Sequence, residues 1–128
     1  MRKILIGIVV IYVIMVVVPF PIYALLSVVA GLEPPTEGSA AQFVASVIVV
    51  KVGVSIAFVH LFYFARTEWI GRWKLYALVW WIMFAIMEFG QAIVPDYTWL
   101  DALGGIIAEA VYFPLSALFV NRLFAAEK

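Results

Sequence analysis

The chain contains no cysteine and a single histidine, and only 12% of its 128 residues are charged. The absence of cysteine excludes disulfides, thiolate chemistry and cysteine-ligated metals, and one histidine cannot form a histidine-rich metal site or a two-histidine haem site. Eight basic and eight acidic residues give a formal net charge of zero, so the chain lacks the basic surface of a nucleic-acid-binding protein. We therefore expect no metal, no cofactor and no nucleic-acid partner.

Long apolar stretches dominate the chain instead. Apolar residues make up 67% of it, whereas a soluble domain is about half apolar. A transmembrane helix needs about 20 mostly apolar residues, and four stretches meet this need, at residues 4–31, 42–65, 73–94 and 100–124. Pro19 and Pro21 interrupt the first. The sequence predicts an all-α membrane protein whose single domain, residues 1–128, is a bundle of four transmembrane helices, with the lipid bilayer as its surroundings.

The segments between these helices are short. Pro34, Pro35 and Gly38 indicate a turn in the first connection, residues 66–72 form a charged second connection, and residues 95–99 form a tight third one. The apolar core of a signal peptide spans about 7–15 residues, and the first apolar run is nearly twice as long. We therefore expect the first helix to stay in the protein uncleaved.

Basic residues lie on one side of the predicted bundle. Apart from Lys51, they precede the first helix, surround the second connection or follow the fourth helix: Arg2, Lys3, Arg66, Arg72, Lys74, Arg122 and Lys128. The other two connections contain only acidic charges, which are Glu33, Glu37, Asp96 and Asp101. Because cytoplasmic loops are rich in lysine and arginine, we predict a multi-pass protein of the cell membrane with both termini cytoplasmic. Tyr97 and Trp99 are expected to mark the outer interface.

Three charged residues, Lys51, Glu88 and Glu109, lie deep within the apolar spans, where charges are costly and usually face the protein interior. At 1.5 Å per residue, Lys51 and Glu109 lie roughly 13 Å, and Glu88 roughly 9 Å, below the helix ends at the acidic side. The sequence therefore predicts a polar layer in the outer half of the membrane. Counting back across the first connection places Tyr23 level with Lys51.

Helical spacing adds neighbours to this layer. Gln91 shares a face with Glu88, and the spacings of four, three and four residues put Gly105, Glu109, Tyr112 and Ser116 on another face. We predict a binding site made of six residues: Lys51, Glu88, Gln91, Glu109, Tyr23 and Tyr112. Because two carboxylates and one ammonium leave a surplus negative charge in a low dielectric, one proton is expected to exchange there near neutral pH.

Other unusual residues favour structural roles. His60 is half a turn out of phase with Lys51, so we expect it to pack with a hydrogen bond, and a proton relay is the alternative. Gly104, Gly105 and Ala108 are small residues that let helix backbones approach closely.

These features favour a small transporter or channel for a proton, an ion or a small polar solute. Four helices enclose little volume, so we expect a homo-oligomer. The alternative is an accessory or anchor subunit of a larger membrane complex. An intramembrane enzyme that acts on a lipid or isoprenoid, with Glu88 and Glu109 as acid and base, is a weaker alternative. It is disfavoured because we find no phosphate-binding loop, metal set or activated nucleophile, and we assign no catalytic residue. A Schiff base between Lys51 and a chromophore is the last alternative.

Overall fold

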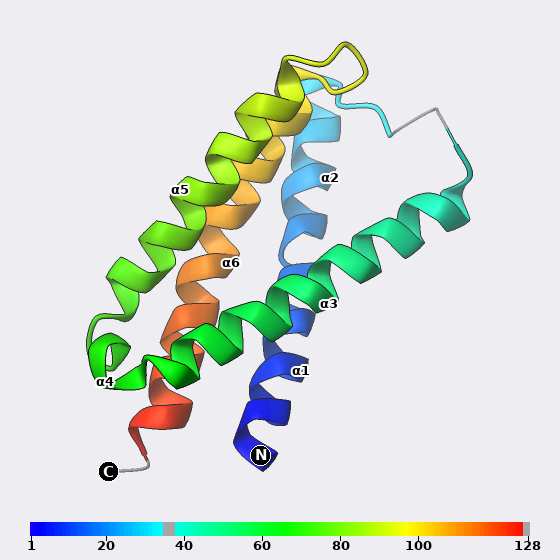
Figure 1. Cartoon of the computed structure of the whole chain (residues 1–128). Coiled ribbons are helices and arrows are strands. Elements are labelled where there is room, and N and C mark those ends of the chain that lie inside the picture. Colours follow the sequence, from blue (N-terminus) through cyan, green and yellow to red (C-terminus); the bar gives the residue numbers. More distant parts are fainter. Residues whose placement is uncertain (35–37, 127–128) are drawn as a thin grey trace.

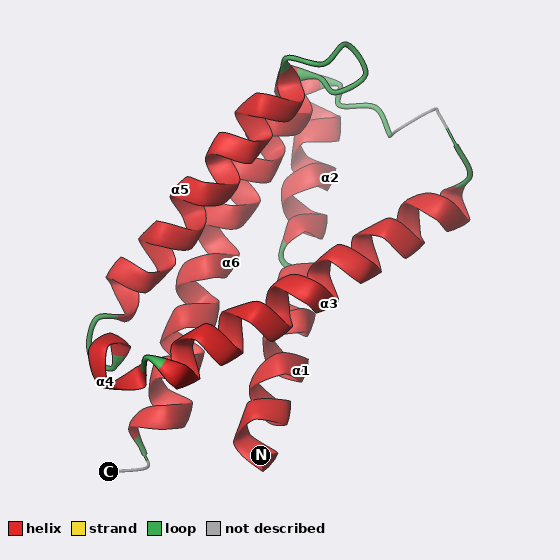
Figure 2. Cartoon of the chain, viewed as in Figure 1, coloured by secondary structure: helices red, strands yellow, loops and turns green. Residues whose placement is uncertain are grey.

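The computed structural model describes residues 1–34 and 38–126, and within these ranges it contains helices and loops but no strand (Figures 1 and 2). Pro35, Glu37 and Lys128 lie outside the described residues. The helices are α1 (Arg2–Val17), α2 (Pro19–Ala30), α3 (Ala40–Phe64), α4 (Arg66–Trp69), α5 (Trp73–Ala92) and α6 (Trp99–Ala125).

Four segments of the described chain are long and apolar enough to cross a membrane. They are α1 with α2, then α3, α5 and α6, which confirms the predicted number of spans. Each predicted boundary lies within two residues of the observed helix end. The short helix α4 was not predicted, because its four residues lie in a charged connection that has no apolar periodicity.

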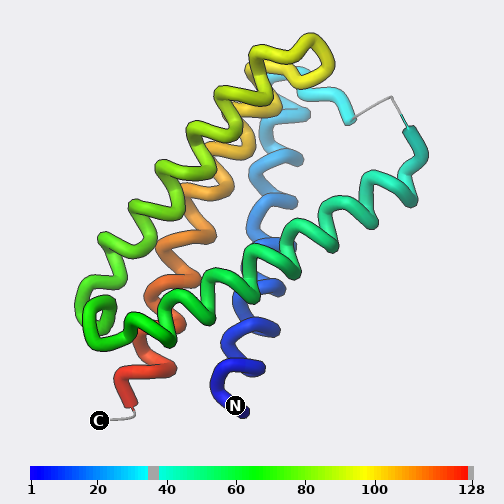
Figure 3. The backbone as a smooth tube through the Cα atoms, viewed as in Figure 1, coloured from blue at the N-terminus to red at the C-terminus, as the bar shows by residue number. Residues whose placement is uncertain are grey.

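The first span is interrupted where its prolines predict. Proline has no backbone N–H, so Pro19 and Pro21 cannot donate to the carbonyls of Met15 and Val17, four residues earlier. Val18 between α1 and α2 nevertheless keeps helical torsion angles, with φ −59° and ψ −40°. The two helices therefore follow one another as a single rod that lacks two hydrogen bonds near its middle (Figure 3).

Capping side chains set where two of the spans begin. At the start of α3, Ser39 Oγ accepts from the backbone N–H of Gln42 at 3.1 Å, and Gln42 Oε1 accepts from that of Ser39 at 3.2 Å. Thr98 and Asp101 form the same reciprocal pair at the start of α6. These pairs satisfy backbone donors that a helix start leaves free.

Aromatic side chains form the core near one end of the bundle. They come from α3, α5 and α6, and we call them the aromatic cluster: Phe58, Phe62, Tyr76, Trp80, Phe113 and Phe124. Ring centroids lie 4.8 Å apart for Phe58 and Tyr76 and 5.1 Å apart for Phe62 and Tyr76. The Tyr76 hydroxyl also donates to the Phe58 carbonyl at 2.5 Å. This packing joins the second half of α3 to the antiparallel pair α5 and α6.

The first half of α3 stands apart from the other helices (Figure 1). Every residue from 40 to 50 is exposed except Val47, which is half-buried. The second half is different, because Ser55, Phe58 and Val59 are completely buried. The helix thus packs at one end and diverges at the other.

Charge is divided between the two ends of the bundle. The start of α1, the connection around α4 and the end of α6 lie together (Figure 1). We call this the basic end, since it carries Arg2, Lys3, Arg66, Arg72, Lys74 and Arg122. The opposite, acidic end carries Glu33, Asp96 and Asp101.

Candidate functional site

The carboxyl group of Glu88 lies directly against the backbone of α6. A Cβ atom added at Gly105 would lie 2.5 Å from both Cδ and Oε1 of Glu88, whereas real Cβ contacts essentially never fall below 3.0 Å. The approach therefore requires a residue without a Cβ atom at position 105. The predicted close packing at Gly105 is present, and its partner is a carboxyl group.

The loop between α5 and α6 supplies a phenol to the same carboxyl group. The hydroxyl of half-buried Tyr97 donates a hydrogen bond to Oε2 of Glu88. Burial, and then the hydrogen bond to Glu88, raise the pKa of Tyr97 above its usual value, so the phenol keeps its proton. The sequence places Tyr97 at the membrane interface and does not assign it to the site. Only the shortness of the loop could have indicated that it returns to Glu88.

A second carboxyl group, that of Glu109, lies one helical turn beyond Gly105. Glu109 is 3% exposed, and its Oε2 atom has no hydrogen-bond partner among the described residues. The carboxyl group of Glu88 is near enough for its charge to act on that of Glu109. Two carboxyl groups therefore lie near one another in the bundle, and one of them has an unsatisfied oxygen.

Tyr23 on α2 reaches the same part of α6. Its ring packs on Gly104, where an added Cβ atom would lie 2.8 Å from Cε1 of Tyr23. Its hydroxyl is near enough to interact electrostatically with both Glu88 and Glu109. The two adjacent glycines of α6 thus admit a phenol from α2 and a carboxyl group from α5.

Lys51 comes from the diverging helix α3 and binds Tyr112. Its Nζ atom donates to the Tyr112 hydroxyl at 3.0 Å and lies 4.5 Å from the centroid of that ring. Neither Glu88 nor Glu109 forms an ion pair with Lys51 in the part of the chain that the structure describes. The two glutamates still interact with its charge at longer range. The ammonium is thus held by a neutral phenol rather than by a carboxylate.

One buried face of α6 carries most of these contacts. Gly105, Glu109, Tyr112 and Ser116 are all buried, as their spacing predicts. Ser116 Oγ, like Glu109 Oε2, has no hydrogen-bond partner among the described residues. The face therefore continues past Lys51 with a further unsatisfied polar atom toward the basic end.

Two residues with expected roles, Gln91 and His60, form no hydrogen bond with these side chains among the described residues. Gln91 is exposed and borders a shallow hollow of about 300 Å³ with Val94, Asp96 and Tyr97. His60 donates from Nδ1 to the carbonyl of Ile56 in its own helix, at 2.8 Å. Its ring lies 5.9 Å from that of Phe64. His60 therefore has the contacts expected of a packing histidine.

No protein-family model, curated protein or solved structure gives a significant match to this chain. No group of three or more histidine, aspartate or glutamate side chains suited to a metal ion occurs in residues 1–34 and 38–126. The site consists of two carboxyl groups, three phenols and one ammonium, which can bind and exchange protons or hold a small cation.

Proposed function

We propose that this protein is a small transporter or channel of the cell membrane for a proton, an ion or a small polar solute. We further propose that its basic end, with both termini, faces the cytoplasm. This orientation follows from the excess of lysine and arginine at that end. It places the paired carboxyl groups in the outer half of the membrane.

The observation that carries this proposal is the unsatisfied Oε2 atom of Glu109. A buried polar atom without a partner costs free energy, and such atoms often mark functional sites or the positions of water and ions. Glu109 lies next to Glu88, so two negative charges would repel each other strongly in this environment. A proton or a cation bound between the two carboxyl groups removes both costs.

The surrounding residues support an exchange of this kind. Tyr97 donates to Glu88 and also borders the hollow at the acidic end, so a short route to water begins beside this carboxyl group. The Lys51 ammonium, held by Tyr112, provides a fixed positive charge on the other side of Glu109. We propose that a proton or cation enters past Tyr97, binds at Glu88 and Glu109, and is limited in its passage by the Lys51 charge.

Proton flux into liposomes tests the proposal. Purified wild-type protein, Glu88→Gln and Glu109→Gln would be reconstituted under a pH gradient, and flux would be followed with an internal pH dye. Glu33→Gln is the matched control, because it makes the same change at an exposed position of the acidic end. We expect flux from wild type and Glu33→Gln and little from the other two variants. Folded, size-exclusion-checked variants that all conduct like wild type would contradict the proposal.

The exposed first half of α3 favours a second candidate function, that of an accessory or anchor subunit. A second copy of this chain could cover the same exposed helix equally well. Residues 40–50 leave one side of α3 without a helix beside it. Cross-linking through a cysteine at Val49, which is 71% exposed, in native membranes separates these cases. A product of twice the chain mass supports a homo-oligomer and the transport proposal. A product of different mass, together with liposomes that show no flux, supports the accessory subunit.

A further inference from the structure

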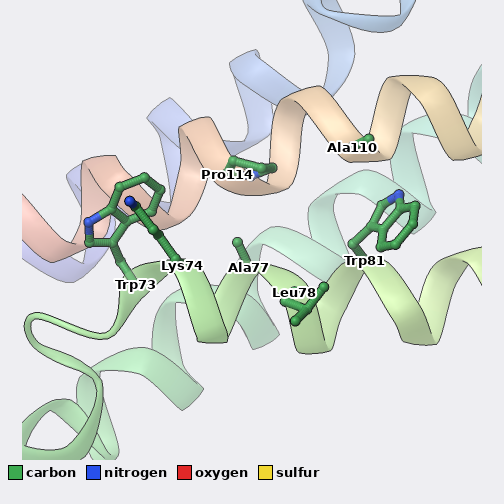
Figure 4. A pocket seen from close by; sticks show the side chains of 7 residues that line it. All are labelled: Trp73, Lys74, Ala77, Leu78, Trp81, Ala110 and Pro114. Atoms are coloured by element: carbon green, nitrogen blue, oxygen red, sulfur yellow. The ribbon is translucent and has the colours of Figure 1, made fainter.

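A groove runs between α5 and α6 on the side of the bundle shown in Figure 4. Its volume is about 420 Å³, and its lining is almost entirely apolar. Seven residues form it: Trp73, Lys74, Ala77, Leu78, Trp81, Ala110 and Pro114. Trp73 and Lys74 lie at one end of the groove, and Trp81 lies toward the other (Figure 4).

Small side chains and a proline create this groove. Ala77 on α5 faces Ala110 and Pro114 on α6, and none of the three fills the space between the helices. From Trp73 to Trp81 the groove follows eight residues of α5, a length of about 12 Å. Half of the hydrocarbon core of a bilayer is about 15 Å thick. The groove therefore spans most of one leaflet, starting from the basic end.

The chemistry of the groove changes along its length. Its deep end offers no free donor, because the Trp81 indole N–H already donates to the Ile106 carbonyl at 3.1 Å. Its other end holds the Lys74 ammonium, which lies 5.7 Å from the Trp73 ring centroid and is exposed. An occupant that complements both ends has an apolar chain and a negatively charged head.

We propose that this groove binds one acyl chain of an anionic phospholipid, whose phosphate is bound by Lys74. An ammonium at the membrane surface attracts anionic headgroups, and tryptophan favours the interface where the glycerol backbone lies. The lipid belongs to the leaflet at the basic end. Glu88 and Glu109 are not among the residues that line the groove, and the proposal does not depend on transport.

Tryptophan quenching by brominated lipids tests the proposal, because Trp73 and Trp81 border the groove. Wild-type protein would be placed in phosphatidylcholine bilayers containing increasing fractions of dibromo-phosphatidylglycerol or, separately, dibromo-phosphatidylcholine. We expect dibromo-phosphatidylglycerol to reach half-maximal quenching at a lipid fraction about fivefold lower than dibromo-phosphatidylcholine does. This is the effect of one basic residue near an anionic headgroup. Equal quenching by the two lipids would overturn the proposal.

Two variants separate the headgroup from the chain. Lys74→Gln should abolish the difference between the lipids, whereas Arg2→Gln, which removes an exposed charge at the same end, should preserve it. Ala110→Phe fills the groove and should remove the high-affinity quenching. Val111→Phe adds the same ring at a neighbouring, 42% exposed position outside the groove and should retain it. If each test variant behaves like its control, the groove is not the binding site.

Discussion

Replacement of Gly105 by alanine tests the position of the Glu88 carboxyl group. The added Cβ atom would lie 2.5 Å from Cδ and Oε1 of Glu88, and ordinary contact begins near 3.4 Å, so the carboxyl group must move by about 1 Å. The carboxyl group ends a flexible side chain, so the helices can stay together, but its hydrogen bond from Tyr97 is broken. A hydrogen bond to a charged group contributes about 1.5–3 kcal/mol, and alanine in place of a helix glycine regains about 1 kcal/mol. We therefore expect a net loss of about 0.5–2 kcal/mol.

The assay is unfolding of the helices in mixed micelles with increasing sodium dodecyl sulfate, followed by circular dichroism. Gly90→Ala is the matched control, because its added Cβ atom meets nothing within 4 Å, and it should be neutral or stabilising. In a Glu88→Ala background, Gly105→Ala should no longer destabilise, since the group it displaces is absent. Unfolding of Gly105→Ala at the same detergent fraction as Gly90→Ala, or a destabilisation that persists in the Glu88→Ala background, would show that Glu88 does not occupy this position.

Three further predictions concern single side chains, each checked by unfolding measurements. Tyr112→Phe should destabilise the protein by about 1.5–3 kcal/mol, and by more than Lys51→Met, which removes the charge together with its bond; the reverse order would contradict this. Ser116→Ala should be neutral or stabilising, because Ser116 Oγ is buried without a partner. Ser55→Ala should be destabilising, because it loses a 2.7 Å hydrogen bond to the Lys51 carbonyl. Equal losses of unfolding free energy in Ser116→Ala and Ser55→Ala would contradict both expectations. Folding raises the pKa of Tyr97 above its unfolded value of about 10. The protonated phenol of Tyr97 therefore contributes its full stabilisation below about pH 10 and progressively less above it. The difference in melting temperature between wild type and Tyr97→Phe should shrink from about pH 8 to about pH 11, and a constant difference would exclude this cause.

The spans could be predicted because crossing a membrane demands long apolar runs and satisfied backbone groups. Pro19 and Pro21 also predicted the interruption of the first helix. The direction of α3 could not be predicted, since the pattern of its apolar residues is nearly the same all around the helix. Its divergence from the bundle is a result of tertiary packing at Phe58 and Phe62, which single-helix patterns do not contain.

Counting depth brought Glu88 and Glu109 to the same region, because antiparallel helices joined by a short loop have little freedom to slide. Helical spacing put Gln91 on the face of Glu88, one turn nearer the loop, and spacing does not predict how deeply a side chain is buried; at that end of α5, Gln91 is exposed. The hydrogen-bond partner of Lys51 could not be predicted from the sequence either, because a long flexible side chain can contact any of several nearby polar groups. Tyr97 lies in a loop, where no periodicity indicates which way a side chain points.

The aromatic cluster makes the bundle stiffer at the basic end than at the acidic end. Near the basic end, α3 cannot leave α5 and α6 without exposing stacked rings, whereas residues 40–50 make no comparable contact. From Phe58 to the start of α3 the helix is about 27 Å long, so a rotation of about 10° at the cluster moves that start by about 5 Å. Lys51 lies on this lever. It is seven residues from Phe58, about 10 Å along the helix, so the same rotation moves its backbone by about 2 Å. The packing of the rings therefore determines how far the Lys51 charge stands from the carboxyl groups.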